Sequence, residues 1–191
     1  MRVLLDREDG IRVLKMEHPS DAEAWRASFA GTFQEVWSDP PYEERWFPDE
    51  AEGVLRRNRA VPDSQTLLAV RESGVVAGFA LGCPVSAAPG VVREIRGLLP
   101  IEHTFYFSEL GVLEQYRRRG LGCQMVALRL ASLNRQKYHH VLMRISTQRD
   151  FVYAMYRDQG FEDTGVFTEV TFRRMDGGVR TDRRVYLSLV L

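Results

Sequence analysis

The residues best suited to bind an anion stand together at positions 117–122, with the sequence RRRGLG. Glycines let the backbone turn tightly and come close to a ligand. The unpaired amides at the start of a helix point outward, with the positive end of the helix dipole behind them. Three arginines strengthen such a site. We therefore expect a turn at 117–122 that binds a pyrophosphate.

Two common phosphate-binding loops do not fit this run. A P-loop needs a Lys directly after its last glycine, and no Lys follows Gly120 or Gly122. A dinucleotide fingerprint needs a third glycine at the position that Met125 occupies here. The remaining alternative is a glycine-containing turn that only precedes a surface helix.

Two strand and helix pairs would position this turn. Residues 105–112 hold the aromatic and β-branched cluster typical of a buried strand, and the residues from Leu121 onward have apolar side chains at helical spacing. A second strand is predicted at 141–147 and a short helix at 151–157. Gly160 then ends that helix before the apolar Phe161.

The first pair resembles motif A of the GCN5-related N-acetyltransferase (GNAT) superfamily, which reads Gln or Arg, x, x, Gly, x, and Gly or Ala. Arg117, Gly120 and Gly122 occupy the three set positions. The preceding strand is similar to the family's LxVxxxY pattern, with Leu110, Val112 and Tyr116 at its set positions.

The second pair resembles motif B of the same family. Tyr156 and the Gly160-Phe161 dipeptide have the family's spacing, whereas Arg149 stands where the family has Asn. This departure affects the usual contact to the pantetheine arm, although a guanidinium could reach an amide oxygen or a phosphate. Both motifs lie in order within residues 105–161, and the rest of the chain matches by topology.

The resemblance implies acetyl-CoA as co-substrate. The 110–112 segment would bulge and offer backbone groups to the pantetheine and thioester, with the Val112 amide as oxyanion donor. Residues 118–123 would hold the pyrophosphate, while Arg117 would order the loop or meet a phosphate. The cofactor-binding residues expected on this basis are Leu110, Gly111, Val112, Arg117, Arg118, Arg119, Gly120, Leu121, Gly122, Cys123 and Arg149.

Acyl transfer from a thioester to an amine also needs an acid for the thiolate and a route to deprotonate the ammonium. Tyr156 matches the family's general acid; the alternative is an aromatic side chain that anchors a short helix. Ser108 shares strand parity with Tyr106, where the family often carries a base or a water-holding residue. Glu109 is the nearby carboxylate, which by parity faces away unless a bulge turns it. It would act through water, or it is an ion-paired edge residue; an amine that arrives partly neutral would need no base.

Composition limits the remaining possibilities. The 191 residues, 45% hydrophobic and 27% charged, fit one domain spanning 1–191. No apolar run has the length of a membrane span, and charges come too early in the first residues for the pattern of a signal peptide. We therefore expect a cytoplasmic protein that binds no membrane. Equal numbers of basic and acidic residues, 26 of each, argue against nucleic-acid binding. The histidines lack metal-ligand spacing, so no metal site is expected, and both cysteines are expected to be reduced.

The pattern of the other segments completes an α/β (α+β) layout. A hairpin, or an arm followed by the first strand, is expected within residues 1–16. A helix is expected from Ser20 with a capping box to Glu23, ended by prolines 40 and 41, and a second helix at 48–59. Hairpins are predicted at 66–81 and 165–191. The order is β-α-α-β-β-β-α-β-α-β-β. The resemblance implies a mixed, mostly antiparallel central sheet with helices on both faces and the cofactor where the two motif strands splay apart.

The leading hypothesis is an N-acetyltransferase acting by direct attack in a ternary complex. Residues 34–52 hold seven acids against Arg45 alone, with four aromatics among them. This mixture favours a small cationic acceptor such as an aminoglycoside, a polyamine or an amino-acid derivative. The alternative for this segment is a solvated connection with core aromatics. The alternative function is a non-catalytic acyl-CoA-binding or partner-regulating domain on the same fold; a homodimer stays open.

Overall fold

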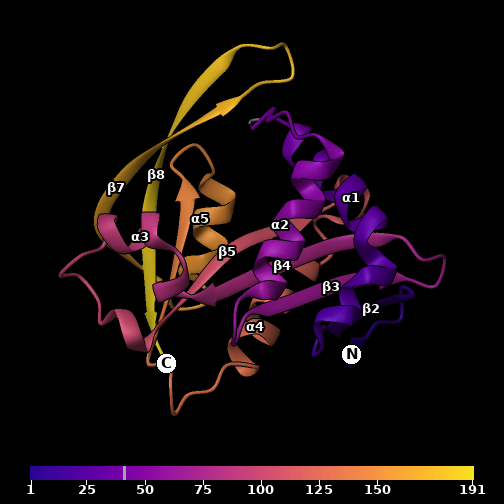
Figure 1. Ribbon diagram of the computed structural model, residues 1–191, viewed down its shortest axis with the longest axis horizontal. Helices are drawn as coiled ribbons and strands as arrows, with labels where there is room; N and C mark the ends of the chain where they lie inside the picture. The colour runs from indigo at the N-terminus through magenta and orange to yellow at the C-terminus, as the bar shows by residue number, and fades with distance from the viewer. Residues whose placement is uncertain (41) are drawn as a thin grey trace.

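The protein is organised around one eight-stranded sheet (Figure 1). A computed structural model describes residues 1–40 and 42–191. The strand order is β1-β2-β3-β4-β5-β6-β8-β7, and every neighbouring pair is antiparallel except β5 with β6. The strands are β1 Arg2–Asp6, β2 Ile11–Lys15, β3 Gln65–Arg71, β4 Val76–Pro84, β5 Thr104–Val112, β6 His140–Ser146, β7 Glu162–Arg173 and β8 Val179–Val190.

Helices cover both faces of the sheet. Phe29 and Phe33 of the first long helix pack against Phe79 of β4, with ring centroids 5.3 and 5.2 Å apart. On the opposite face, Leu121 and Met125 pack against the other sides of β2–β4. The helices are α1 Arg26–Ser38, α2 Pro48–Ala60, α3 Pro89–Glu94, α4 Leu121–Ala131 and α5 Asp150–Arg157, with 3-10 turns η1 Pro19–Trp25, η2 Val85–Ala87, η3 Ile101–His103 and η4 Glu114–Tyr116.

The sheet opens between its two parallel strands. In the described chain, β5 and β6 pair from Thr104↔His140 to Phe107↔Met143, although both strands continue further. β5 bulges at this point: Phe107 pairs with Gly82 and Glu109 pairs with Leu81 on β4, so the register skips Ser108. The two motif strands therefore separate as predicted, with β5 following β4 and β6 following β8.

The predicted fold class is confirmed, and two elements add to the predicted order. The N-terminal segment forms a full hairpin of β1 and β2, and the link before β5 contains α3. The predicted capping box of Ser20 and Glu23 is wrong. The Asp21 carboxylate instead accepts hydrogen bonds from the amides of Glu17 and His18, at 2.9 and 3.0 Å. Pro41 lies outside the described residues, and α1 ends at Ser38. Among the described helices, none is long and apolar enough to cross a membrane.

The β7–β8 hairpin extends past the sheet and reaches the connection between α1 and α2 (Figure 1). The Arg45 amide donates to the Arg173 carbonyl at 2.8 Å, and the Met175 amide donates to the Glu43 carbonyl at 3.0 Å. Glu44 and Arg174 also form an antiparallel bridge. The hairpin tip therefore holds this connection in place beside the opening of the sheet.

Candidate active site

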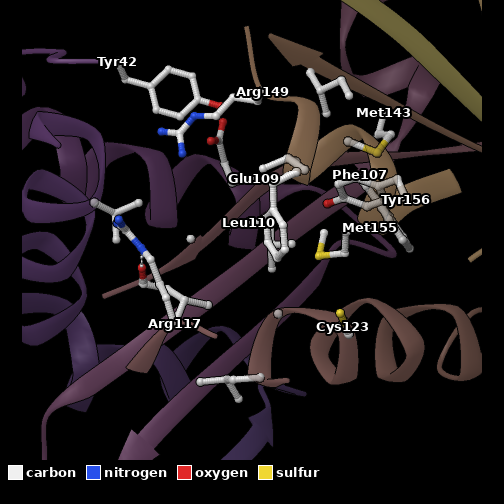
Figure 2. Close-up of a pocket in the computed structure, with 18 of the residues that line it drawn as sticks. Tyr42, Phe107, Glu109, Leu110, Arg117, Cys123, Met143, Arg149, Met155 and Tyr156 are labelled. Atoms are coloured by element: carbon white, nitrogen blue, oxygen red, sulfur yellow. Dashed lines mark hydrogen bonds between the residues drawn. The ribbon is translucent and has the colours of Figure 1, made fainter. Parts of the chain in front are cut away.

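A cavity of about 570 Å³ lies where β5 and β6 separate (Figure 2). Its walls come from α1 and the connection after it, from β5, from the 117–123 turn, and from β6 and α5. Ten of the eleven residues expected to bind the cofactor line it. The exception is Arg119, whose carbonyl accepts a hydrogen bond from Arg7 Nη2 at 3.1 Å.

The 117–123 turn presents free backbone amides. Gly120 has φ 77° as the N-cap of α4, and Arg118 has φ 58°, so the chain reverses sharply before the helix. The Gln124 amide bonds to the Gly120 carbonyl at 3.0 Å, but within the described residues the amides of 118–123 donate to no protein acceptor. These amides and the helix dipole can hold a phosphate group. The turn thus fits the pyrophosphate of the expected co-substrate.

Arg117 orders this turn. Its Nε donates to the Val112 carbonyl at 2.7 Å, and its Nη2 donates to Asp39 Oδ2 at 2.7 Å. The guanidinium therefore joins the end of β5 to the end of α1. Of the two roles expected from the sequence, the ordering of the loop is the one with observed contacts.

Glu109 faces the cavity because the β5 bulge reverses the strand parity. Its side chain is half-buried, and desolvation raises the pKa of its carboxyl to about 7. The nearby Glu44 raises this pKa further, whereas Arg184, Arg144 and Arg129 lower it. A carboxyl with a pKa near the working pH is suited to general-base catalysis.

Ser108 also borders the cavity, but its hydroxyl is engaged. Ser108 Oγ donates to the Leu81 carbonyl at 3.2 Å, across the bulge. Through this hydrogen bond, Ser108 joins β5 to β4 at the bulge.

Tyr156 lies on the α5 side of the cavity, at 2% exposure. Its ring packs edge-on against Phe161 at 5.3 Å, so its orientation is fixed by the core. Burial raises the pKa of its hydroxyl to about 12. The hydroxyl therefore stays protonated at neutral pH and can donate a proton or a hydrogen bond.

The sequence matches the acetyltransferase (GNAT) family over residues 22–161. The chain belongs to this family. The predicted family and enzyme class are thereby confirmed, and no curated protein matches the sequence of this acetyltransferase.

Solved structures share the fold at low sequence identity. A ribosomal-protein-alanine N-acetyltransferase from Brucella melitensis is 20% identical, with a TM-score of 0.64, and the match covers 93% of this chain and 99% of that one. The yncA protein of Salmonella typhimurium, solved with its cofactor acetyl-CoA, is 15% identical with a TM-score of 0.63 over 95% and 94%. An Acinetobacter baylyi structure is 14% identical with a TM-score of 0.65 over 95% and 93%.

Arg149, the residue that departs from motif B, lines the acetyltransferase cavity. Its Nη2 donates to the Pro40 carbonyl at 3.3 Å, and its guanidinium carbon lies 4.3 Å from the Tyr42 ring centroid. Figure 2 shows the two side chains side by side at the cavity. Arg149 thus joins the start of α5 to the α1–α2 connection.

The acids at 34–52 are mostly paired with arginines from elsewhere. Five of the seven form ion pairs, and among the described residues none of the seven lines the cavity. The pairs are Asp39 with Arg117, Glu43 with Arg174, Glu44 with Arg184, Glu50 with Arg173 and Glu52 with Arg26. Of the four aromatics, Trp37 and Tyr42 line the cavity, while Trp46 packs edge-on against Phe33 at 5.0 Å. The acids of this segment therefore do not border the cavity themselves, although the charge of Glu44 raises the pKa of Glu109 there.

Sequence reasoning missed a buried polar network beside the acetyltransferase site. Arg184 bonds Glu44 at 3.0 Å and Asp182 at 2.9 Å, and Asp182 accepts the Ser146 hydroxyl at 2.9 Å. Reasoning also missed Arg129, which lies four residues after Met125 on the inner face of α4. In the sequence, Arg129 stands out as a charged residue at an apolar position of a helix. For Arg184, the alternation of inward and outward side chains along β8 was a weaker signal.

Proposed function

We propose that this protein transfers the acetyl group of acetyl-CoA to the amine of a small acceptor by direct attack in a ternary complex. The observation that carries the proposal is the Glu109 carboxyl, which has a pKa of about 7 and faces the cavity at the point where the sheet opens. Tyr156, a protonated hydroxyl, lies in the same cavity (Figure 2). A base and an acid are thus available to one reaction centre.

The backbone of the site suits acetyl-CoA. The free amides at 118–123 would hold its pyrophosphate. Beyond Phe107, β5 no longer pairs with β6, so residues 110–112 can offer backbone groups to the pantetheine and thioester. Acetyl-CoA, when bound, supplies the activated acyl group.

The side chains would then handle the protons. Glu109 accepts a proton from the acceptor ammonium, directly or through one water, which makes the amine nucleophilic. The Val112 amide donates to the oxygen on which negative charge develops. Tyr156 donates its proton to the departing thiolate. Ser108 supports these steps by bonding across the bulge that aims Glu109.

Charge at the cavity supports one of the three acceptor classes. The charged residues that line it are Glu109, Glu114, Arg117, Arg118, Arg144 and Arg149. Arg144 lies 3.6 Å from Glu94, and Arg149 donates to a carbonyl and stacks on Tyr42. With Arg117 and Arg118 at the proposed phosphate turn, Glu109, Glu114, Arg144 and Arg149 remain for the acceptor. This even mixture of both signs suits an amine that also carries an anionic group more than a polyamine or an aminoglycoside. We therefore favour an amino-acid derivative.

An amine panel tests the proposal. Thiol release from acetyl-CoA is measured with amino acids, with the same amino acids as amides, with polyamines and with aminoglycosides. We expect a higher kcat/KM for the free amino acids than for their amides, and a lower kcat/KM for the polyamines and aminoglycosides than for the free amino acids. Polycations as the best acceptors would overturn the acceptor class. Tight acetyl-CoA binding by calorimetry with no thiol release for any amine would instead support the non-catalytic alternative.

A further inference from the structure

Arg129 of α4 is fully buried, with 0% exposure, although it is an arginine on the apolar face of a helix. Its hydrogen-bond partners are two carbonyl oxygens and one side-chain amide oxygen rather than a carboxylate. Burying a guanidinium costs free energy that such bonds offset only with good geometry. A buried apolar side chain would serve the packing of α4 at lower cost, so the position of this charge has another reason.

The contacts of Arg129 all lie around the β5 bulge. Nη1 donates to the Glu109 carbonyl at 3.2 Å, and Nη2 donates to the Leu81 carbonyl on β4. The guanidinium carbon lies 3.6 Å from the centroid of the Phe107 ring. These three residues flank Ser108, the position at which the pairing of β4 with β5 shifts.

Two further contacts fix the guanidinium in this place. Nε donates to Gln65 Oε1 at 3.4 Å, while Gln65 Nε2 donates to the Arg129 carbonyl at 3.0 Å. Gly82 leaves room for the group, since a Cβ there would lie 3.2 Å from Arg129 Nη2 and 2.8 Å from the Tyr106 carbonyl. The planar fork of an arginine can serve two carbonyls at once, which a lysine ammonium does less well.

We propose that Arg129 is a positioning residue that fixes the β5 bulge and thereby aims the Glu109 side chain into the cavity. A bulge disrupts the strand ladder locally, and Arg129 satisfies the carbonyls on both sides of it. Without Arg129, fewer contacts would stabilise the bulged form of β5, whose reversed parity brings Glu109 to the site. This inference rests on the proposed role of Glu109 as the base.

The charge of Arg129 also reaches both proposed catalytic groups. It lowers the pKa of Glu109, which Arg184 of β8 and Arg144 of β6 lower as well and Glu44 of the α1–α2 connection raises. It also lowers the pKa of Tyr156, which Tyr42 and Cys123 raise. Loss of the Arg129 charge should therefore move the pKa of Glu109 upward.

The test compares Arg129→Lys with Arg129→Met. We expect both to lower kcat by roughly tenfold to a hundredfold with little change in the KM for acetyl-CoA, because a displaced Glu109 meets the acceptor poorly. The pH at which kcat/KM is half-maximal should rise in Arg129→Met and stay near wild type in Arg129→Lys, which keeps the charge. A ¹³C NMR titration of the Glu109 carboxyl in the protein without acetyl-CoA should show the same two midpoints.

The controls keep the outcome decisive. Arg59→Met removes an arginine that is only partly buried and that donates to the Met16 carbonyl at 3.2 Å, and this variant should leave kcat and the midpoint unchanged. If Arg129→Met does not fold, Gln65→Leu, which frees the guanidinium, should lower kcat in the same direction. Wild-type kcat in folded Arg129→Lys and Gln65→Leu would overturn the inference. If Glu109→Gln is also fully active, the proposed function of Glu109 has failed instead.

Discussion

The proposed phosphate-binding turn at 117–123 and the proposed acceptor side of the cavity, with Tyr42, Glu109 and Arg144, are built in different ways. The turn consists of consecutive residues and acts through backbone amides. The acceptor side brings together side chains from the α1–α2 connection, β5 and β6, supported by ion pairs to β8. A backbone site tolerates many side chains but not added bulk facing the ligand. A side-chain site can be tuned by single charges, and the two halves should therefore respond differently to substitution.

The largest effect is expected at the acceptor side. Glu109→Gln removes the base and should lower kcat/KM by about 100- to 10,000-fold. In the wild type, kcat/KM should rise as pH increases through about 7, because the carboxyl is protonated and inactive below its pKa. Rates measured from pH 5.5 to 9 should lose this rise in the variant. Calorimetry should show unchanged acetyl-CoA affinity; a variant with wild-type rates would remove Glu109 from the mechanism.

Tyr156→Phe should lower turnover by about 100-fold, near the lower end for a general acid, since a thiolate is a comparatively weak base. The ring stays packed against Phe161, so the fold and the Kd for acetyl-CoA should change little. Steady-state kinetics combined with calorimetry separate the two quantities. If kcat is unaltered, Tyr156 serves packing alone.

At the turn, Gly122→Glu should weaken acetyl-CoA binding by well over tenfold, because it places bulk and negative charge at the phosphate site. Gly122→Ala is the matched control. Within 4 Å and among the residues that the structure describes, a Cβ at this position would meet only Met155 Sδ, at 3.7 Å, so the protein should fold and bind almost normally. Calorimetry on both variants decides: equal affinities would place the pyrophosphate elsewhere.

A smaller effect is expected from Glu44→Gln. Glu44 raises the pKa of Glu109, so its neutralisation should shift the rise of kcat/KM to lower pH, opposite to Arg129→Met. Peak activity should fall only a few-fold, since Arg184 keeps its bond to Asp182. The order of preference among the amines should not change, because Glu44 does not line the cavity. Selective loss of the cationic acceptors would show that these acids form an acceptor wall after all.

The same contrast explains what the sequence could predict. The turn, Tyr156 and the strands and helices around them follow from residues close together in the chain, and their patterns are local. Glu109 could not be assigned in this way: regular strand alternation points it away, and only the pairing with β4 shows the bulge. In the sequence, residues 34–52 show a net negative charge, with Arg45 as the one base among them. Three of the five arginines that pair with these acids come from residues 173–184, far along the chain.

Fold prediction failed in a similar way at small scale. Ser20 and Glu23 have the spacing of a capping box, but Asp21 caps the turn and also lies 2.7 Å from the N-terminal ammonium. That contact depends on where the first residue ends up in three dimensions. Local patterns therefore predicted the helices and strands. Which of several nearby acids caps the turn could be read only from the folded structure.

The attachment of the β7–β8 hairpin to residues 43–45 makes the α1–α2 connection, which carries the cavity-lining Tyr42, a modular part of the protein. Insertions or deletions at the hairpin tip would reshape that connection while the 117–123 turn keeps its sequence and geometry. Over evolutionary time, a lineage could change its acceptor by altering the length of one surface hairpin. A laboratory library randomised at 173–178 would explore the same variation.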